Sequence, residues 1–286
     1  MITWPKALIG ELAARRCIVF MGAGASAGAS TPEGKRPPTW LTFLEMMLVQ
    51  ARTTAKEQNS IKSLIKKERY LDAAEIIRQR IDPSDFSQLI RTTFQLPKYE
   101  PSIIHKNILS IDPKVVITTN YDRIYDDFCT QGEASEGYNI CKYYEGHLVS
   151  DLRSSVRLIV KAHGCVTDPA KIILTRSEYF QARHHHASFY RVLDSLFLTN
   201  TILFLGYSLS DPDIQLVLEN AAIAAPSSHP HYAVIPRGTH QAIKESISKA
   251  YNLRYLEHAQ GDYDDVNNSL TVLSEEVLHY REEHRG

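Results

Sequence analysis

Short apolar runs recur along this chain, and segments with helical spacing lie between them. The first run, RCIVFM at residues 16–21, does not alternate with polar positions, which is typical of a strand covered on both faces. Strands that alternate with helices predict an α/β fold, here a Rossmann-like parallel sheet with helices on both of its faces. Four further runs share this character, at residues 114–118, 156–160, 201–205 and 232–235. We predict weaker strands at residues 138–142 and 253–256.

The interval between the first two strong strands is longer than a single crossover connection needs. It holds about ninety residues, and apolar positions recur in it at helical spacing. We therefore predict a helical insertion, residues 40–101, after the first strand. Near the end of the chain, an apolar stripe that includes Leu270 and Val277 predicts an amphipathic helix over residues 262–286. We expect residues 1–286 to form one domain that carries both additions.

The charge balance argues against a protein that captures polyanions. The chain has 32 Lys and Arg residues against 33 Asp and Glu residues, which gives a formal net charge of −1. Electrostatic attraction dominates binding to nucleic acid and to anionic membranes, and it needs a basic surface. We interpret the local basic face at Lys62, Lys66, Lys67 and Arg69 as solvated surface. Direct nucleic-acid binding and membrane association are therefore not expected.

The distribution of apolar residues and cysteines indicates the compartment. No apolar run approaches the roughly 18 residues of a membrane span, and MITWPKALIGELAARR at the start holds no signal-peptide core. The four cysteines form no CxxC pair, so we predict neither a disulfide framework nor a zinc site. The consecutive histidines at 184–186 would point about 100° apart on a helix and cannot converge on one metal ion. We expect a cytoplasmic protein without a bound metal.

A glycine-rich segment, MGAGASAGAS, follows the first strand directly. It matches the pattern G-x-G-x-x-A through Gly22, Gly24 and Ala27. In that pattern the first glycine allows a tight turn, the second lets backbone amides approach a pyrophosphate, and the small third residue lets the next helix pack closely. The acidic residue that ordinary dehydrogenases carry about 20 positions later is missing. The segment predicts a dinucleotide site of another kind, the alternative being a small-residue turn without a ligand.

Three later strands end on polar residues, in the segments VVITTNYD, KAHG and GYSLSD. The carboxyl ends of parallel strands meet at one edge of a sheet, where open α/β folds hold their ligands. Asn120 and His163 are our candidates for catalysis at that edge. Each polar residue also has a structural alternative: Asn120 and Asp122 can cap the next helix, and His163 can be a satisfied core residue. For Asp211, which precedes Pro212, a helix cap is the interpretation we favour.

The ordered set GAGAS, TTNYD, KAHG and GYSLSD resembles the motifs of the sirtuin family, which binds and cleaves NAD. The resemblance covers about residues 15–236. It implies that Asn120 holds the nicotinamide ribose or a water molecule and that His163 acts as the base on the ribose hydroxyls. It also implies that NAD is bound, with the glycine-rich loop at the pyrophosphate, Asp122 at the nicotinamide amide and the last motif at phosphate or ribose. The binding residues so implied are Gly22, Ala23, Gly24, Ser26, Thr119, Asp122, Gly206 and Ser208.

The departures from that family narrow the resemblance. The four-cysteine zinc module of sirtuin deacylases is absent, KRPPTW replaces a Phe-Arg pair near the nicotinamide, and Thr119 stands where the family has Gln. The chain in these respects is similar to sirtuin-like effectors of bacterial anti-phage defence, in which helices replace the zinc module. That resemblance implies an NAD glycohydrolase that releases nicotinamide and ADP-ribose, with NAD as substrate and no metal. Oxocarbenium-like cleavage needs ribose positioning and an attacking water, which Asn120 and His163 suit.

Two other functions stay open from the sequence. One is an NAD-dependent protein deacylase, and the other is a non-catalytic regulatory subunit that binds NAD or ADP-ribose. By family analogy we also expect a homo-oligomer and a second defence protein that triggers the activity, because the chain leaves little room for a sensor domain. We nominate the insertion and the C-terminal helix for self-association. The preference between NAD and NADP stays open, because no acid or arginine that would read the ribose can be assigned.

Overall fold

The central strand of the computed structural model is β1 (Cys17–Met21), and all five of its residues are buried. It lies in a seven-stranded sheet of order β3-β4-β2-β1-β5-β6-β7, in which every neighbouring pair is parallel. This confirms the α/β, Rossmann-like fold, and the two weaker predicted strands form the sheet edges. The other strands are β2 (Val115–Thr118), β3 (Tyr138–Lys142), β4 (Arg157–Lys161), β5 (Thr201–Leu205), β6 (His231–Pro236) and β7 (Leu253–His258). The structure describes residues 1–286 except 132–136, 210, 226–228, 239–240 and 285–286.

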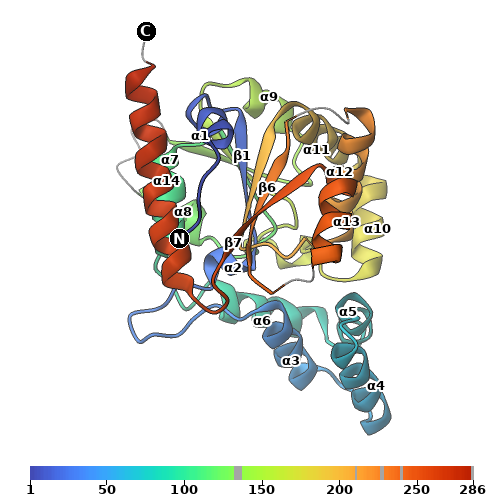
Figure 1. Ribbon diagram of the computed structural model, residues 1–286. Helices are drawn as coiled ribbons and strands as arrows, with labels where there is room; N and C mark the ends of the chain where they lie inside the picture. The colour runs from blue at the N-terminus through green and yellow to red at the C-terminus, as the bar shows by residue number, and fades with distance from the viewer. Residues whose placement is uncertain (132–136, 210, 226–228, 239–240, 285–286) are drawn as a thin grey trace.

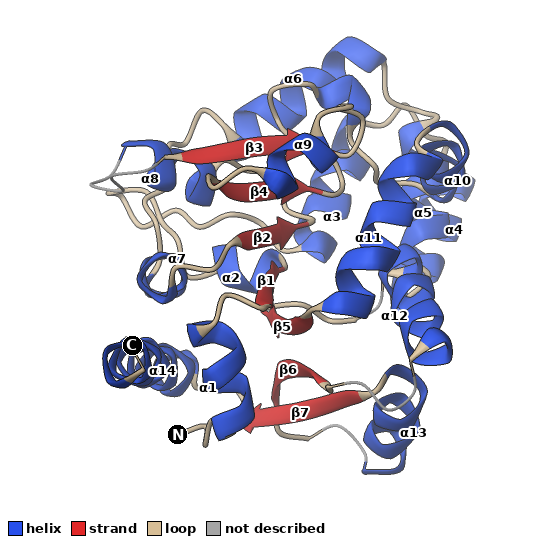
Figure 2. Ribbon diagram, turned by 90° about the horizontal axis from the view of Figure 1, so that it is seen from above, coloured by secondary structure: helices blue, strands red, loops and turns tan. Residues whose placement is uncertain are grey.

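Helices cover both faces of the sheet, so each face has its own hydrophobic core. Val19 of β1 packs in one core with residues of α1 (Lys6–Ala13), α7 (Ile103–Ile111) and α14 (Tyr263–Glu283). Its neighbour Phe20 packs in the other core with residues of α11 (Ala187–Thr199) and α12 (Pro212–Ala224). Figure 2 shows these two groups of helices on opposite sides of the strands. A strand buried on both faces needs no polar alternation, which explains the unbroken apolar runs in the sequence.

The helical insertion after β1 lies at the carboxyl edge of the sheet. Its helices share a core that includes Met47 and Ile77, together with Ile172 and Leu174 from the loop that follows β4. Figure 1 shows α3, α4 and α5 below the strand ends. The helices are α3 (Trp40–Gln50), α4 (Ala55–Lys66), α5 (Tyr70–Arg78) and α6 (Pro83–Phe94). The insertion therefore packs against the loop after β4, which begins with the predicted motif KAHG. The limits of the insertion at residues 40 and 101 and the single-domain organisation stay predictions.

The remaining helices complete the layers around the sheet. The apolar stripe of α14 is buried, with Leu270 and Val277 fully inaccessible between α1 and α7. None of the helices in the described ranges combines the length and the apolar character needed to cross a membrane. The other helices are α2 (Ala23–Ser26), α8 (Ile124–Gln131), α9 (Leu148–Arg153), α10 (Arg176–His185), α13 (Gln241–Tyr251) and the 3-10 helix η1 (Pro169–Lys171).

Candidate active site

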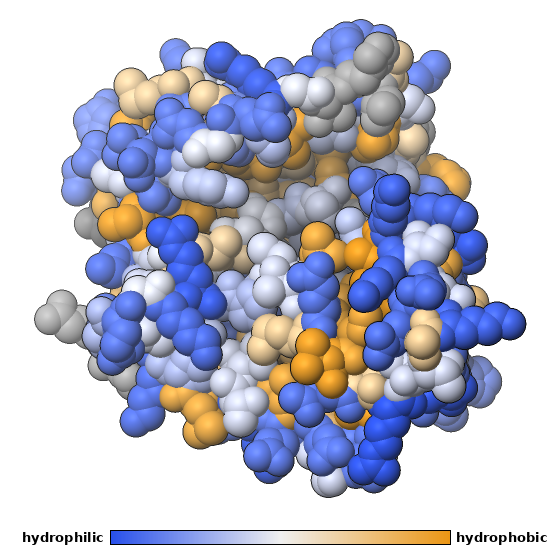
Figure 3. Space-filling view, turned by 90° about the horizontal axis from the view of Figure 1, so that it is seen from below, coloured by the Kyte–Doolittle hydropathy of each residue, from blue (hydrophilic) through white to orange (hydrophobic). Residues whose placement is uncertain are grey.

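The four predicted motifs meet at one edge of the sheet. They follow β1, β2, β4 and β5, and these strands are consecutive in the sheet in the order β4-β2-β1-β5. Residues far apart in sequence, such as Gly22, Asn120 and Gly206, are thereby neighbours. Figure 3 views the molecule from below, the side of the strand ends and the insertion, and a hollow opens in this face. The order of the strands alone therefore brings the four predicted segments to one edge of the sheet.

The glycine-rich loop packs directly against the loop that follows β5. The amide of Gly24 donates to the carbonyl of Gly206 at 2.9 Å, and a Cβ atom on Gly24 would lie 2.7 Å from the Gly206 Cα. A Cβ on Gly22 would lie 2.4 Å from the Gly206 carbonyl oxygen. Gly206 itself has a φ of +61°, which a residue with a side chain rarely adopts. These three glycines are required by the close approach of two loops, a reason that sequence reasoning did not supply.

Asn120 joins the β2 loop to the glycine-rich loop. Its Nδ2 donates to the carbonyl of Gly22 at 2.9 Å and to the Ser26 hydroxyl at 3.0 Å. The side chain is half-buried, as is that of the preceding Thr119. Because the amide nitrogen makes both bonds, the amide oxygen is the atom of Asn120 that suits a water molecule or a ribose hydroxyl. The structural alternative considered for Asn120, a cap of the next helix, is not the arrangement seen.

Asp122 is engaged within the protein through both carboxylate oxygens. Oδ2 accepts from the Ser26 hydroxyl at 3.0 Å, and Oδ1 accepts from the amide of Ile124 at 3.1 Å, at the start of α8. Both Ser26 and Asp122 are buried. This is the capping alternative that the sequence left open for Asp122. Of the implied binding residues, Ala23, Gly206 and Ser208 are exposed at the edge. Ser26 and Asp122 are buried, and their hydrogen bond joins the glycine-rich loop to the loop after β2.

A buried ion pair supports the β2 loop, and sequence reasoning missed it. Lys161, the last residue of β4, donates to the carbonyl of Asp122 and lies 3.3 Å from the carboxylate of Asp126. Burial raises the pKa of Asp126. For Lys161, burial lowers the pKa and the Asp126 carboxylate raises it, with a net upward shift. The available signal was a lysine at the end of the otherwise apolar run VRLIVK.

His163 is paired with Asp211 behind the strand ends. The Nε2 of His163 lies 3.0 Å from the Oδ2 of Asp211, and both side chains are less than one-tenth exposed. The hydroxyl of Tyr179 donates to the same oxygen at 2.8 Å. Burial raises the pKa of Asp211, but His163 and these hydrogen bonds outweigh it and leave the pKa below the ordinary value. The carboxylate is therefore ionised beside the imidazole.

The helix cap favoured from the sequence for Asp211 accounts for only one of its two oxygens. Oδ1 accepts from the amides of Asp213 and Ile214 at 2.9 and 3.1 Å and begins α12. The other oxygen holds His163, a role that the sequence interpretation omitted. The contact joins the loops that follow β4 and β5, two strands that are not neighbours in the sheet, so spacing along the chain carries no direct sign of it.

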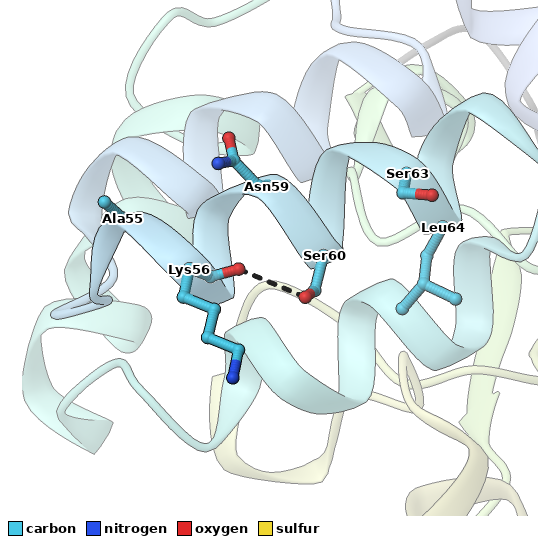
Figure 4. Close-up of a pocket in the computed structure, with 6 residues that line it drawn as sticks. All are labelled: Ala55, Lys56, Asn59, Ser60, Ser63 and Leu64. Carbon is cyan, nitrogen blue, oxygen red and sulfur yellow. Dashed lines mark hydrogen bonds between the residues drawn. The ribbon is translucent and has the colours of Figure 1, made fainter.

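A surface pocket of about 680 Å³ lies away from this edge, on α4. All of its lining residues come from that one helix, and Figure 4 shows them along its surface, with the Ser60 hydroxyl bonded to the carbonyl of Lys56. A single helix supplies one wall and does not enclose a ligand. We therefore assign the candidate site to the strand ends and not to this depression. Trp40 is the last residue of the segment KRPPTW, which replaces the family's Phe-Arg pair, and it packs near Tyr70 within the insertion, with ring centroids 6.3 Å apart.

The parallel sheet defines a protein of the Rossmann-like class, in which ligands typically bind at the carboxyl edge, where the polar residues of this chain gather. A family described as the SIR2-like domain matches residues 114–256, half of the chain. The chain belongs to this SIR2-like family.

Curated relatives extend the match to other parts of the chain. Defense-associated sirtuin 2 of Bacillus subtilis is 25% identical over 206 residues, which is 71% of this chain and 19% of that protein. The NAD(+) hydrolase ThsA of Acinetobacter baumannii (strain 532279) is 22% identical over 281 residues, 94% of this chain and 54% of the relative. ThsA of Bacillus cereus (strain MSX-D12) is 22% identical over 265 residues, 92% of this chain and 52% of the relative. The chain thus spans about a fifth to about half the length of these relatives.

Proposed function

We propose that this protein hydrolyses NAD to nicotinamide and ADP-ribose in bacterial anti-phage defence. The observation that carries the proposal is the pairing of His163 with an ionised Asp211 in the loops that follow β4 and β5. Asn120, in the loop after β2, is hydrogen-bonded to the glycine-rich loop at the same edge of the sheet. The relatives named NAD(+) hydrolase ThsA and defense-associated sirtuin support the same activity.

The proposed chemistry uses the two edge residues for different tasks. Cleavage of the N-glycosidic bond leaves positive charge on the ribose, and a water molecule then adds its oxygen to the anomeric carbon and loses a proton. The amide oxygen of Asn120 orients that water or a ribose hydroxyl. When His163 donates its Nε2 hydrogen to Asp211, Nδ1 carries the lone pair and can accept a proton from a ribose hydroxyl, which in turn takes the proton that the attacking water loses. Asp211 then stabilises the imidazolium that forms.

Gating and location belong to the same proposal. A hydrolase that consumed NAD continuously would harm its host, so we propose that self-association or a second defence protein controls it. The insertion and α14 are the surfaces that we nominate for self-association. A cytoplasmic location fits the four cysteines, each of which is buried and forms no disulfide.

The experiment that tests the proposal is incubation with NAD in the absence of peptide, with separation of the products by liquid chromatography. We expect equal amounts of nicotinamide and ADP-ribose. Asn120→Ala and His163→Ala should each lower the rate by about 10²–10⁴-fold, as expected for groups that position or transfer protons in the transition state. Asn220→Ala and His185→Ala, at exposed positions on α12 and α10 and outside the surfaces nominated for self-association, are matched controls that should retain the rate.

Two outcomes would favour the other functions. Nicotinamide release only with an acyl-lysine peptide would indicate a deacylase. Binding of NAD or ADP-ribose without turnover, in both the dilute and the assembled protein, would indicate a regulatory subunit.

A further inference from the structure

A cluster of metal-binding side chains lies at the end of the edge strand β3, outside the candidate active site. Cys141 is in β3, Glu145 is in the following turn and His147 directly precedes α9. One donor atom from each, a sulfur, a carboxylate oxygen and a ring nitrogen, lie within 4.8 Å of one another. In the sequence the cysteine stands alone, because its partners are a glutamate and a histidine, so a search for cysteine pairs does not find the group.

A second layer of contacts orients two of these side chains. The Oδ2 of Asp151 lies 2.6 Å from the Nδ1 of His147, which leaves Nε2 with the lone pair, 3.4 Å from Oε2 of Glu145. Glu145 is held by Lys142, whose amide donates to Oε2 at 2.7 Å and whose Nζ lies 3.1 Å from Oε1. A carboxylate behind a histidine and a hydrogen bond to a ligating carboxylate are the typical outer contacts of metal sites.

The distance between His147 and Glu145 and the charges of the cluster fit a small divalent cation. In tetrahedral coordination, with metal–sulfur bonds of about 2.3 Å and metal–nitrogen or metal–oxygen bonds of about 2.0–2.1 Å, ligand atoms lie about 3.3–3.6 Å apart. The nitrogen–oxygen separation of 3.4 Å between His147 and Glu145 already has this value. A thiolate at Cys141 with the carboxylates of Glu145 and Asp151 carries three negative charges, which Lys142 and a divalent cation neutralise.

We propose that Cys141, Glu145 and His147 bind one zinc ion, with water as the fourth ligand. Thiolate, imidazole and carboxylate together suit zinc, whereas magnesium and calcium prefer oxygen ligands alone. The bound ion would tie the end of β3 to α9 at the sheet edge. This proposal is independent of NAD hydrolysis, because the site lies one strand beyond β4, which precedes His163, and shares no residue with the candidate active site.

Metal titration of the full chain tests the proposal. Metal-free protein is titrated with Zn²⁺ against a chromophoric chelator, and separately with Co²⁺ while the thiolate-to-cobalt charge-transfer band is recorded. We expect one ion per chain. Cys141→Ser should abolish the band, and His147→Ala and Asp151→Asn should weaken zinc binding, the latter by about 10–100-fold. His147 is half exposed, so the His147→Ala variant should fold. Zinc binding can therefore be tested in that variant even if the variant at the buried Cys141 does not fold.

Two control variants make the result specific. Cys129→Ser removes another free, buried cysteine, and this variant should bind zinc normally. His185→Ala removes part of the consecutive histidines and should also have no effect. The proposal is wrong if the metal-free protein binds no zinc at micromolar concentration, if His147→Ala binds like wild type, or if binding is lost in His185→Ala.

Discussion

Replacement of Asp211 by Asn removes the charge behind His163 and keeps the helix cap. Asn is as good an N-cap as Asp, so its side-chain oxygen can still accept from the amides of Asp213 and Ile214. Two unit charges 3.0 Å apart, with an effective dielectric constant of about 20, interact by about 5.5 kcal/mol. Both charges are spread over two atoms, which brings the expected effect to about 1–3 pH units in the titration of the pair.

The assay for Asp211→Asn is kcat/KM for NAD as a function of pH. Loss of the carboxylate disfavours the imidazolium, so the acidic limb of the profile should move to lower pH by about 1–3 units. The plateau should fall by about 10²–10⁴-fold, because the imidazole loses both its orientation and the charge that supports proton acceptance.

The matched control is Asp82→Asn, at the start of α6. Asp82 is also an N-cap followed by proline, and its Oδ1 accepts from the amide of Ser84 at 2.8 Å. This variant changes a cap in the same way without touching His163, so its rate and pH profile should match those of wild type. An Asp211→Asn enzyme with an unshifted profile and most of its activity, or an equal loss in Asp82→Asn, would refute the reasoning.

Three further predictions concern buried titratable groups and close-packed glycines of the fold. Lys161→Met leaves Asp126 buried without its partner and should lower the free energy of unfolding by about 3–5 kcal/mol in urea denaturation, with recovery when Asp126→Leu is added; a loss below 1 kcal/mol would contradict this. Gly24→Ala places a Cβ against backbone and should weaken NAD binding and lower the melting temperature, whereas Gly146→Ala, where a Cβ meets nothing within 4 Å, should do neither. Burial lowers the pKa of His231 to about 4, so between about pH 6.5 and 4 the unfolded chain binds a proton that the folded chain does not. His231 should therefore contribute a loss of stability of roughly 3 kcal/mol as pH drops through that window, and a His231→Asn variant with the same pH slope as wild type would disprove it.

The fold followed from the sequence because its strands are buried on both faces. Every position of β1 and β5 is buried, and the glycine-rich and polar segments after them locate the carboxyl edge. Strand order came from the structure, since nothing in the spacing states that β4 neighbours β2 and that β1 neighbours β5.

The candidate site was only partly predictable, because its decisive contacts join distant segments. Asn120 and His163 could be named from their places after strands. The bond between His163 and Asp211 spans 48 positions (211 − 163), and Asp211 already had a sufficient local explanation as a cap. The glycines illustrate the same limit: the sequence indicated why a ligand would need Gly24, but only the packing of two loops reveals the nearby Gly206 backbone.

The most direct test of the central claim is product analysis after incubation of the wild-type protein and His163→Ala with NAD alone. The account predicts that the wild type releases nicotinamide and ADP-ribose in equal amounts and that His163→Ala is slower by about 10²–10⁴-fold while it remains folded. Equal rates for the two proteins, or no ADP-ribose from the wild type in its assembled form, would contradict it.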